Sequence, residues 1–344
     1  MKVALDISPL QTGHKVRGIG SYTQNLSEEL KKNKESIDFE FFSDPASPPP
    51  ADVIHYPYFD LFFHTLPTST KTSRVVTIHD VIPLVFPEHF PIGPKGFLHL
   101  FLQKRSLKNT HMVICNSKTS KEDIANKLSY PKDRIRVTYL APGNNFKEET
   151  NINKLKSQTK KFNLPKEFAL YVGDVNWNKN ISGLLESIKI SKIDLVMVGA
   201  SLTNRKIAET ELLEKLIKNL NLNHKVHRLG YISEKELIAL YNLASVTLQP
   251  SFYEGFGFPV LESMICGTPV VCSNVASLSE IAGDAAIFCD PQDPTDIARK
   301  TSYVLNLSVK AKKNLAQMCI AHAGSFSWKK VARQTIEVYK SLHD

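Results

Sequence analysis

Short apolar runs rich in β-branched residues alternate with helix-forming stretches along most of this chain. In the first half, the strand-like runs are KVALDI, DFEFFS, DVIHYP, RVVTIHD, HMVICNS and IRVTYLA. In the second half they are FALYVGDV, DLVMVGA, KVHRLGYI, SVTLQPS, TPVVCSN and AAIFCD, and helical patterns such as YTQNLSEELKK and SKEDIANKL lie between many of them. Because apolar runs without strict alternation are typical of strands covered on both faces, the pattern predicts an α/β protein with doubly wound parallel sheets.

A polar stretch near residues 143–166 interrupts this succession, and a new series of strands follows it. The length of 344 residues also exceeds the roughly 100–150 residues typical of one domain. We therefore predict a Rossmann-like domain in residues 1–150, a second one in residues 166–326, and a last helix in residues 327–344 that crosses back to the first domain. Two such domains facing a central cleft would bind ligands at the carboxyl ends of their strands. The proline- and aromatic-rich segment 48–70 is expected to be a loop beside this cleft.

Composition indicates a folded, soluble protein, because hydrophobic residues make up 42% of the chain and charged residues 22%. The N-terminal run MKVALDISPLQTG is too short for a signal peptide, and no window approaches the ~18–20 apolar residues of a membrane span. We therefore expect a cytoplasmic protein. The cysteines form no CxxC pair and are predicted to be buried free thiols in a reducing compartment. They are Cys115, Cys266, Cys272, Cys289 and Cys319.

The net charge of +9 is concentrated in one segment, because residues 91–136 hold ten Lys and Arg against three Asp and Glu. Within it, residues 95–108 combine apolar and basic side chains with helical spacing. The apolar ones are Phe97, Leu98, Phe101 and Leu102, and the basic ones are Lys95, Lys104, Arg105 and Lys108. A basic amphipathic helix can lie on an anionic membrane, so peripheral membrane contact is one hypothesis; a core-packed helix with a solvated basic face is the other. No nucleic-acid-binding motif accompanies the charge, so nucleic acid is not an expected partner.

The segment SFYEGFGFPVLE carries the clearest chemistry in the chain. Glu254 and Glu262 are separated by seven residues, and a glycine-containing loop and Pro259 lie between them. Proline is favoured in the first turn of a helix, so a helix is predicted to begin at Pro259 and to carry Glu262. Free N–H groups and the helix dipole can hold a diphosphate there, with Glu262 accepting hydrogen bonds from a ribose and Glu254 facing a sugar. The alternative is that glutamate near a helix start merely complements the dipole.

Two segments of the first half also end strands with polar or glycine residues. His79 and Asp80 follow the run VVTI, where the imidazole can donate a hydrogen bond to a sugar hydroxyl or a leaving phosphate. The alternative is a helix-capping aspartate beside a packed histidine. Gly18 and Gly20 precede Ser21, a predicted N-cap, in a loop that is by itself only a weak phosphate signal.

Two further segments belong to the second half. Lys179 follows a strand end and precedes a helix, where a cation can neutralise a diphosphate leaving group. The alternative is that Lys179 is an ordinary exposed lysine at the start of a helix. In LGYISEKEL, Ser233 and Glu236 form a predicted capping box just after Tyr231 and Ile232.

These segments together resemble the family-4 glycosyltransferases of the GT-B fold, whose mark is written E-G-F-G-x-P-x-L-E before a PVV strand. Residues 254–271 match it almost letter for letter, and the resemblance covers essentially the whole chain. It implies that Glu254 contacts the transferred sugar, that Glu262 binds the ribose, and that the backbone of Phe256, Gly257 and Phe258 holds the phosphates. Leu261 is assigned to the same donor site.

For the other segments, the resemblance places His79 beside the donor sugar and Gly18 and Gly20 near the phosphates and acceptor. It places the turn at Tyr231 and Ile232 near the nucleobase. The family often has an arginine near the lysine, whereas this chain has Asp174 and Asn178. Lys179 must then supply more of the positive charge, with help from Arg17.

The resemblance implies a retaining glycosyltransferase that needs no metal or other cofactor. Its loops are similar to those of bacterial polysaccharide mannosyltransferases, so the expected donor is GDP-mannose, with UDP-glucose or UDP-N-acetylglucosamine as the alternative, and the expected acceptor is a growing or lipid-linked glycan. A non-catalytic donor-binding subunit, motivated by the missing arginine, is the main rival. A GT-B epimerase or phosphorylase fits the glutamate pair less well, and a dehydrogenase lacks its G-x-G-x-x-G.

Overall fold

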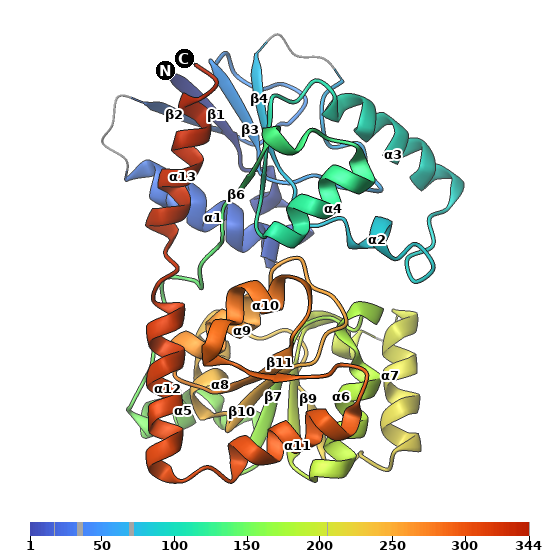
Figure 1. The fold of residues 1–344 in the computed structure, drawn as a ribbon, viewed down its shortest axis with the longest axis vertical. Helices are drawn as coiled ribbons and strands as arrows, with labels where there is room; N and C mark the ends of the chain where they lie inside the picture. Colours follow the sequence, from blue (N-terminus) through green and yellow to red (C-terminus); the bar gives the residue numbers. More distant parts are fainter. Residues whose placement is uncertain (17, 33–36, 69–71, 205, 344) are drawn as a thin grey trace. The chain divides into compact units, whose positions relative to one another are not determined.

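The computed structural model describes residues 1–16, 18–32, 37–68, 72–204 and 206–343. The chain forms two compact units. Unit 1 comprises residues 1–144 and 326–344, and unit 2 comprises residues 145–325. Each unit contains one parallel sheet of six strands, so the predicted α/β class with doubly wound parallel sheets is confirmed (Figure 1). Each of the twelve apolar runs forms one of the strands.

The sheet of unit 1 has the strand order β2-β1-β3-β4-β5-β6, with every pairing parallel. The strands are β1 (Lys2–Asp6), β2 (Asp38–Phe42), β3 (Val53–Tyr56), β4 (Ser73–Thr77), β5 (Met112–Cys115) and β6 (Ile135–Val137). The α-helices are α1 (Gly18–Lys31), α2 (Ile82–Val85), α3 (Pro94–Leu107), α4 (Lys118–Leu128) and α13 (Trp328–Lys340). The direction of succession reverses between β1 and β3, which is where doubly wound sheets bind ligands.

The sheet of unit 2 has the order β12-β11-β10-β7-β8-β9 and is also parallel throughout. Its strands are β7 (Phe168–Val172), β8 (Asp194–Val198), β9 (Val226–Arg228), β10 (Val246–Gln249), β11 (Val270–Ser273) and β12 (Ile287–Cys289). Its α-helices are α5 (Ile152–Thr159), α6 (Ile181–Ser191), α7 (Ala208–Asn219), α8 (Glu234–Leu243), α9 (Phe258–Ile265), α10 (Ala276–Ala282), α11 (Pro294–Leu305) and α12 (Val309–Ala323). The reversal point lies between β7 and β10.

Alternate side chains of one strand enter different cores in unit 2. Along β7, Ala169 and Tyr171 join a cluster with α6, α7 and α11, whereas Phe168 and Leu170 join a second cluster that includes residues of α8. Both sets of side chains are almost fully buried. This two-sided burial explains why the strand sequences are apolar at consecutive positions instead of every second one.

The last helix, α13, lies in unit 1 although the whole of unit 2 precedes it in the chain. It packs alongside α1 (Figure 1). Trp328, at its start, is 1% exposed and donates an indole hydrogen bond to the Pro142 carbonyl (3.0 Å). Tyr339, near its end, is fully buried. Two buried aromatic residues therefore hold α13 against unit 1 near both of its ends.

Local signals differ in how well they located helix starts. Ser233 and Glu236 form the predicted capping box at the start of α8, with Ser233 N donating to Glu236 Oε2 (2.9 Å). The N-cap prediction for Ser21 is wrong, because α1 begins at Gly18 and Ser21 lies inside it. A Cβ atom on Gly20 would lie 2.4 Å from the His14 carbonyl oxygen, so this glycine lets a neighbouring turn pack directly on α1.

All five cysteines are buried and free, as the sequence predicted. In the described part of the chain, no helix combines the length and apolar character that crossing a bilayer requires.

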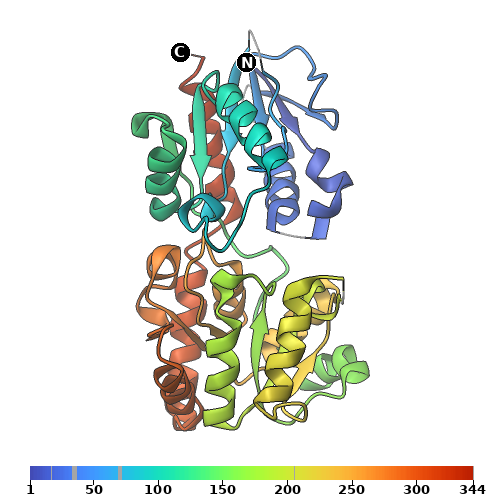
Figure 2. The same cartoon turned by 90° about the vertical axis from the view of Figure 1, so that its right-hand side faces the viewer.

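Figure 2 shows α3 on the surface of unit 1. Its residues Leu100, Gln103, Ser106 and Leu107 face inward and are buried. Its aromatic residues Phe97 and Phe101 are 62% and 64% exposed. Helix α3 therefore packs on unit 1 through one face, as the alternative of a core-packed helix expects, and exposes both basic and aromatic side chains on the other.

Candidate active site

The reversal point of the unit 2 sheet brings Lys179 and Glu254 together. Lys179 ends the loop after β7, and Glu254 lies in the loop after β10, the strand that pairs with β7. The ammonium nitrogen lies 2.8 Å from both carboxylate oxygens. Their side chains are only 19% and 7% exposed, so this is a largely buried ion pair. Two residues that the sequence assigned to one ligand therefore contact each other directly.

The asparagines on either side of Lys179 connect the loop after β7 to the loop after β10 by hydrogen bonds. Asn178 is 4% exposed; its carbonyl accepts a hydrogen bond from Phe252 N (2.8 Å), and its amide donates to the Tyr253 carbonyl (3.0 Å). Asn180 donates to the Pro250 carbonyl (2.9 Å) and caps α6 from a left-handed conformation with φ 52°. Asn178, which stands in the region where the family often has arginine, thus joins the two loops that carry the ion pair.

Glu254 has further donors that the sequence analysis missed. Gln249 Nε2 (2.9 Å) and Ser251 Oγ (2.8 Å) both donate to Glu254 Oε1, and both residues are fully buried. With Lys179, Oε1 has three donors, whereas Oε2 has Lys179 alone among the described contacts. A carboxylate oxygen can accept more than one hydrogen bond, so Oε2 keeps capacity for a ligand hydroxyl. The available signal was a polar Gln and Ser ending the apolar run SVTLQPS.

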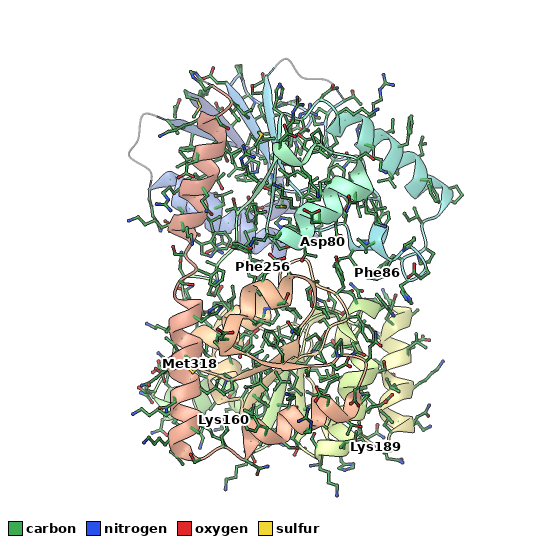
Figure 3. All side chains as sticks on the ribbon, in the orientation of Figure 1. Asp80, Phe86, Lys160, Lys189, Phe256 and Met318 are labelled. Atoms are coloured by element: carbon green, nitrogen blue, oxygen red, sulfur yellow. The ribbon has the colours of Figure 1, made fainter. Side chains whose placement is uncertain are left out.

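The loop from Glu254 to Phe258 has a fixed backbone. The Ser277 hydroxyl lies 2.8 Å and 2.9 Å from the carbonyls of Glu254 and Phe256. Gly257, the N-cap of α9, has φ 111°, and a Cβ atom there would lie 2.6 Å from Leu278 Cδ2. Phe256, labelled in Figure 3, is 4% exposed and packs edge-on against Phe258 (5.3 Å between ring centroids). Only glycine satisfies both the backbone angle and the space at position 257.

Glu262 lies in α9, which begins within one residue of the predicted Pro259. Tyr241, fully buried in α8, donates a hydrogen bond to Glu262 Oε2 (2.9 Å). Desolvation nevertheless raises the pKa of Glu262 to about 7, because the Tyr241 hydrogen bond offsets only part of the cost of removing the carboxylate from water. Among the described contacts Oε1 remains available to accept hydrogen bonds. Tyr241 was not predicted from the sequence.

The remaining predicted donor residues of unit 2 differ in accessibility. Leu261 is fully buried in α9, so its side chain belongs to the core and only its backbone could meet a ligand. Ile232 is 9% exposed and packs in the second core cluster. Tyr231 is 64% exposed at the turn before α8. Of these three side chains, only that of Tyr231 is open to solvent.

In unit 1, His79 follows the carboxyl end of β4. Its Nε2 atom lies 3.1 Å from the Pro57 carbonyl, an acceptor, so Nε2 carries the hydrogen and Nδ1 has the lone pair. Desolvation lowers the pKa of His79 to about 4, so the ring is neutral near pH 7. The sequence analysis expected this imidazole to donate a hydrogen bond to a sugar hydroxyl or a phosphate. In this arrangement Nε2 donates to Pro57 instead, so Nδ1 can serve a ligand only as a hydrogen-bond acceptor.

Asp80, labelled in Figure 3, accepts a hydrogen bond at Oδ1 from Ile82 N (3.1 Å) at the start of the short helix α2. The N-cap of α2 is Val81, so Asp80 orders the turn before this helix and is not its capping residue. Gly18 is exposed in the first turn of α1, and Gly20 is buried there. Arg17 lies outside the described residues. Among the described residues, no group of three or more His, Cys, Asp or Glu side chains is placed to hold a metal ion.

Comparisons with known proteins agree with this arrangement. Residues 153–325 match the family model of glycosyl transferases group 1, and residues 47–141 match that of glycosyltransferase family 4. The O-antigen chain mannosyltransferase B of Escherichia coli is 33% identical over 271 residues, which cover 78% of this chain and 70% of that protein. The serotype-specific mannosyltransferase WbdA of Escherichia coli is 26% identical over 291 residues, 82% of this chain but 35% of WbdA.

Solved structures show the same fold. Sucrose-phosphate synthase from Thermosynechococcus elongatus is 20% identical with a TM-score of 0.75, covering 100% of this chain and 99% of that one. HepE from Anabaena, solved with UDP and glucose, is 16% identical with a TM-score of 0.74, covering 99% of both chains. Two parallel Rossmann-like sheets with this loop structure define a glycosyltransferase of the GT-B fold. The chain belongs to the glycosyl transferases of group 1.

The ion pair leads to a first prediction about stability. Lys179→Met leaves Glu254 buried without its cation and should lower the unfolding free energy by about 3 kcal/mol. Glu254→Gln removes the charge that needs compensation, so the double variant should lose less than the sum of the single ones. Urea unfolding of the four proteins measures the coupling, which should exceed about 1 kcal/mol. Additive losses would show that the two charges do not interact.

A second prediction concerns Glu262. Its pKa of about 7 in the folded protein exceeds the ordinary value of 4.5, so the folded state binds more protons between these values and the free energy of unfolding falls as pH rises from about 4.5 to 7. Glu262→Gln keeps the shape but abolishes this loss. The variant should gain about 2 kcal/mol over the parent at pH 8 and little at pH 5. An equal difference at both pH values, measured by urea unfolding, would exclude a raised pKa.

Proposed function

We propose that this chain transfers mannose from GDP-mannose to a glycan acceptor in polysaccharide biosynthesis, with retention of configuration and without a metal cofactor. The observation that carries the proposal is the Lys179–Glu254 pair at the reversal point of the unit 2 sheet. The choice of mannose is supported by similarity to O-antigen mannosyltransferases of Escherichia coli and to the O-antigen chain mannosyltransferase RfbU of Salmonella typhimurium, 29% identical over 233 residues.

The diphosphate is proposed to bind at Lys179 and the start of α9. An ammonium group has three N–H donors, and the two Glu254 oxygens take two of them. The third can point at a phosphate oxygen, where it would stabilise the negative charge that develops as the nucleoside diphosphate leaves. The backbone N–H groups of Gly257 and Phe258, at the start of a helix, would add to that stabilisation.

The transferred sugar is proposed to bind Glu254 through Oε2, the oxygen with remaining acceptor capacity. We assign Glu254 a sugar-positioning role, because a carboxylate surrounded by Lys179, Gln249 and Ser251 is stabilised as an anion and is a poor nucleophile. His79 remains a proposed catalytic residue, and its Nδ1 atom would accept a hydrogen bond from a sugar hydroxyl. Asp80 is retained as the weaker candidate beside it.

The nucleoside is proposed to bind Glu262 and the turn before α8. Glu262 Oε1 would accept a hydrogen bond from the ribose, while Tyr241 holds Oε2. An ionised carboxylate accepts such bonds more strongly than a protonated carboxyl group, so donor binding should favour the unprotonated form of a group with a pKa of about 7. The exposed ring of Tyr231 is free to stack on a nucleobase, with Ile232 behind it.

The alternative is a non-catalytic subunit that binds a nucleotide sugar. It is motivated by Asp174 and Asn178 in the region where arginine is common. Asn178 joins the two loops, and Asp174 Oδ1 accepts a hydrogen bond from Ser201 (2.8 Å), so neither adds positive charge. Turnover of any nucleotide sugar would exclude this alternative.

Contact with a membrane is also proposed, because a lipid-linked acceptor would lie at one. Helix α3 exposes Phe97, Leu98 and Phe101 by 59–64%, and it contains no acidic residue. Lys95 and Arg105 are exposed on the same helix, and Lys108 is exposed at its C-cap. Exposed aromatic side chains among cations suit the interface of a bilayer with anionic headgroups.

A donor panel is the third prediction. GDP-mannose should bind, and slow release of GDP should be detectable by calorimetry and a coupled assay, with no loss of activity in EDTA. Glu262→Ala should weaken binding by about tenfold or more because a charged hydrogen bond is lost. Glu211→Ala, on the exposed face of α7, is the matched control and should change nothing.

Other outcomes of that panel are equally informative. Preference for UDP-glucose or UDP-N-acetylglucosamine would overturn the choice of GDP-mannose. Binding without turnover, in the presence of glycan acceptors, would favour the non-catalytic subunit. The anomeric configuration of any product, read by NMR, tests retention.

The fourth prediction concerns α3. The protein should sediment with phosphatidylglycerol vesicles at low salt and not with phosphatidylcholine vesicles. Phe97→Ser with Phe101→Ser, and separately the neutralisation of the four cations of α3, should each reduce binding at least about tenfold. The cations are Lys95, Lys104, Arg105 and Lys108.

The control for this experiment neutralises four exposed lysines elsewhere and leaves α3 intact. They are Lys310, Lys313, Lys329 and Lys330. If both charge variants lose binding equally, the attraction comes from net charge and not from this helix. If no variant changes partitioning, the surface does not contact the membrane.

A further inference from the structure

A chain of buried hydrogen bonds crosses unit 1 from its last helix to its first. Tyr339 Oη in α13 lies 2.6 Å from His55 Nδ1 in β3. His55 Nε2 lies 2.8 Å from Thr77 Oγ1 at the end of β4, and Thr77 Oγ1 lies 2.9 Å from Tyr22 Oη in α1. Each of the four side chains is at most 1% exposed.

The chain ends against the predicted catalytic histidine. The ring of Tyr22 meets that of His79 edge-on, with 4.9 Å between centroids and an interplanar angle of 83°. Thr77 is also two residues before His79 on the same strand end. Among the described residues, the hydrogen bonds and ring contacts of the His79 ring are those with the Pro57 carbonyl, at Nε2, and with Tyr22, while Ser120 bonds its backbone oxygen (3.0 Å).

Such a chain is a costly way to fill a core. Two phenols, an imidazole and a hydroxyl lose their water, and hydrogen bonds within proteins only roughly offset that loss. Burial lowers the pKa of His55 to about 3, so its imidazole is neutral and connects Tyr339 to Thr77 as donor on one side and acceptor on the other. Apolar side chains of similar size would pack these elements without that cost.

We propose that Tyr339 is a positioning residue, which acts through His55, Thr77 and Tyr22 to set the ring orientation of His79. The hydroxyl of Tyr339 fixes the imidazole of His55, the imidazole fixes the hydroxyl of Thr77, and that hydroxyl fixes the ring of Tyr22. The Tyr22 ring, in edge-on contact with the imidazole, then limits the orientations that the His79 ring can adopt. The C-terminal helix thereby belongs to the catalytic apparatus of unit 1 without touching a substrate. The catalytic part of this inference rests on the proposed function of His79.

Two conservative variants break the chain at different links, and a third is a matched control. Tyr339→Phe removes only the terminal hydroxyl, and Thr77→Val removes the middle hydroxyl with little change of shape. Tyr130→Phe is the control, because Tyr130 is a buried tyrosine of unit 1 whose hydroxyl donates to the Thr110 carbonyl (2.9 Å), away from the chain. Tyr339→Phe and Tyr130→Phe each lose one buried hydrogen bond, so similar decreases in Tm are expected for these two variants. Thr77→Val loses two, to His55 and Tyr22, and should lower Tm further.

The decisive readout is the histidine ring. In 15N-histidine-labelled protein, the Nδ1 and Nε2 resonances of His79, assigned by their absence from His79→Gln, should move in Tyr339→Phe and Thr77→Val and stay in place in Tyr130→Phe. With GDP-mannose, kcat for GDP release should fall about tenfold in the first two variants while KM changes little, as expected when a catalytic group is misaligned. The control variant should keep the parental kcat.

The outcomes separate this inference from the proposed function. Unchanged His79 resonances in both chain variants would overturn the positioning role, whatever the activity. Shifted resonances in a protein that turns over no nucleotide sugar would support the positioning role and overturn the proposed function instead. If Tyr339→Phe does not fold, Thr77→Val alone decides, because its break lies between His55 and Tyr22.

Discussion

A carboxylate that is almost removed from water is the constraint on which the site in unit 2 depends. Glu254 is 5% exposed and therefore needs compensation for its charge. Lys179 supplies the opposite charge, and Gln249 and Ser251 supply neutral donors. The flanking Asn178 and Asn180 then become necessary, because they hold the lysine loop against the glutamate loop. Removing Lys179 leaves the Oε2 atom of Glu254 without a donor among the described contacts.

The strand order makes this compensation possible. β7 and β10 are neighbours in the sheet although about seventy residues separate them in the chain, and their following loops leave the sheet at the same edge. The same arrangement of parallel strands in unit 1 places His79 at the end of β4. Polar chemistry thus collects at strand ends because the strands themselves are buried on both faces and can carry almost only apolar side chains.

The two units stabilise their buried polar groups by different arrangements of hydrogen-bonding partners. Unit 2 gathers charged and amide groups around one carboxylate at a loop. Unit 1 instead runs a line of neutral groups through its core, from Tyr339 through His55 and Thr77 to Tyr22. The first arrangement keeps acceptor and donor capacity for a ligand. The second is enclosed on all sides, so its effect on a ligand can only pass through a neighbour such as His79.

Sequence alone determined the architecture and indicated the candidate site residues, for identifiable physical reasons. Burial on both faces leaves an apolar signature that located all twelve strands, and glycine with proline between two glutamates indicated a ligand loop before α9. The capping box at Ser233 was also readable, since both partners lie within one helical turn. Each of these signals is local: the residues that produce it are near one another in the chain.

Only the tertiary structure decided which residues surround those groups. Tyr241 was missed because its partner, Glu262, lies on another helix. Gln249 was missed although it is near Glu254 in the chain, because the path of the loop between them decides whether their side chains meet. The start of α1 was misplaced because Gly20 is required by a turn packed against it, which no propensity records. The direction of the His79 hydrogen bonds depended on the Pro57 carbonyl, which lies just after another strand, β3. The contacts of Tyr241 and Pro57 depend on three-dimensional folding, because residues distant in sequence meet only when the sheets form.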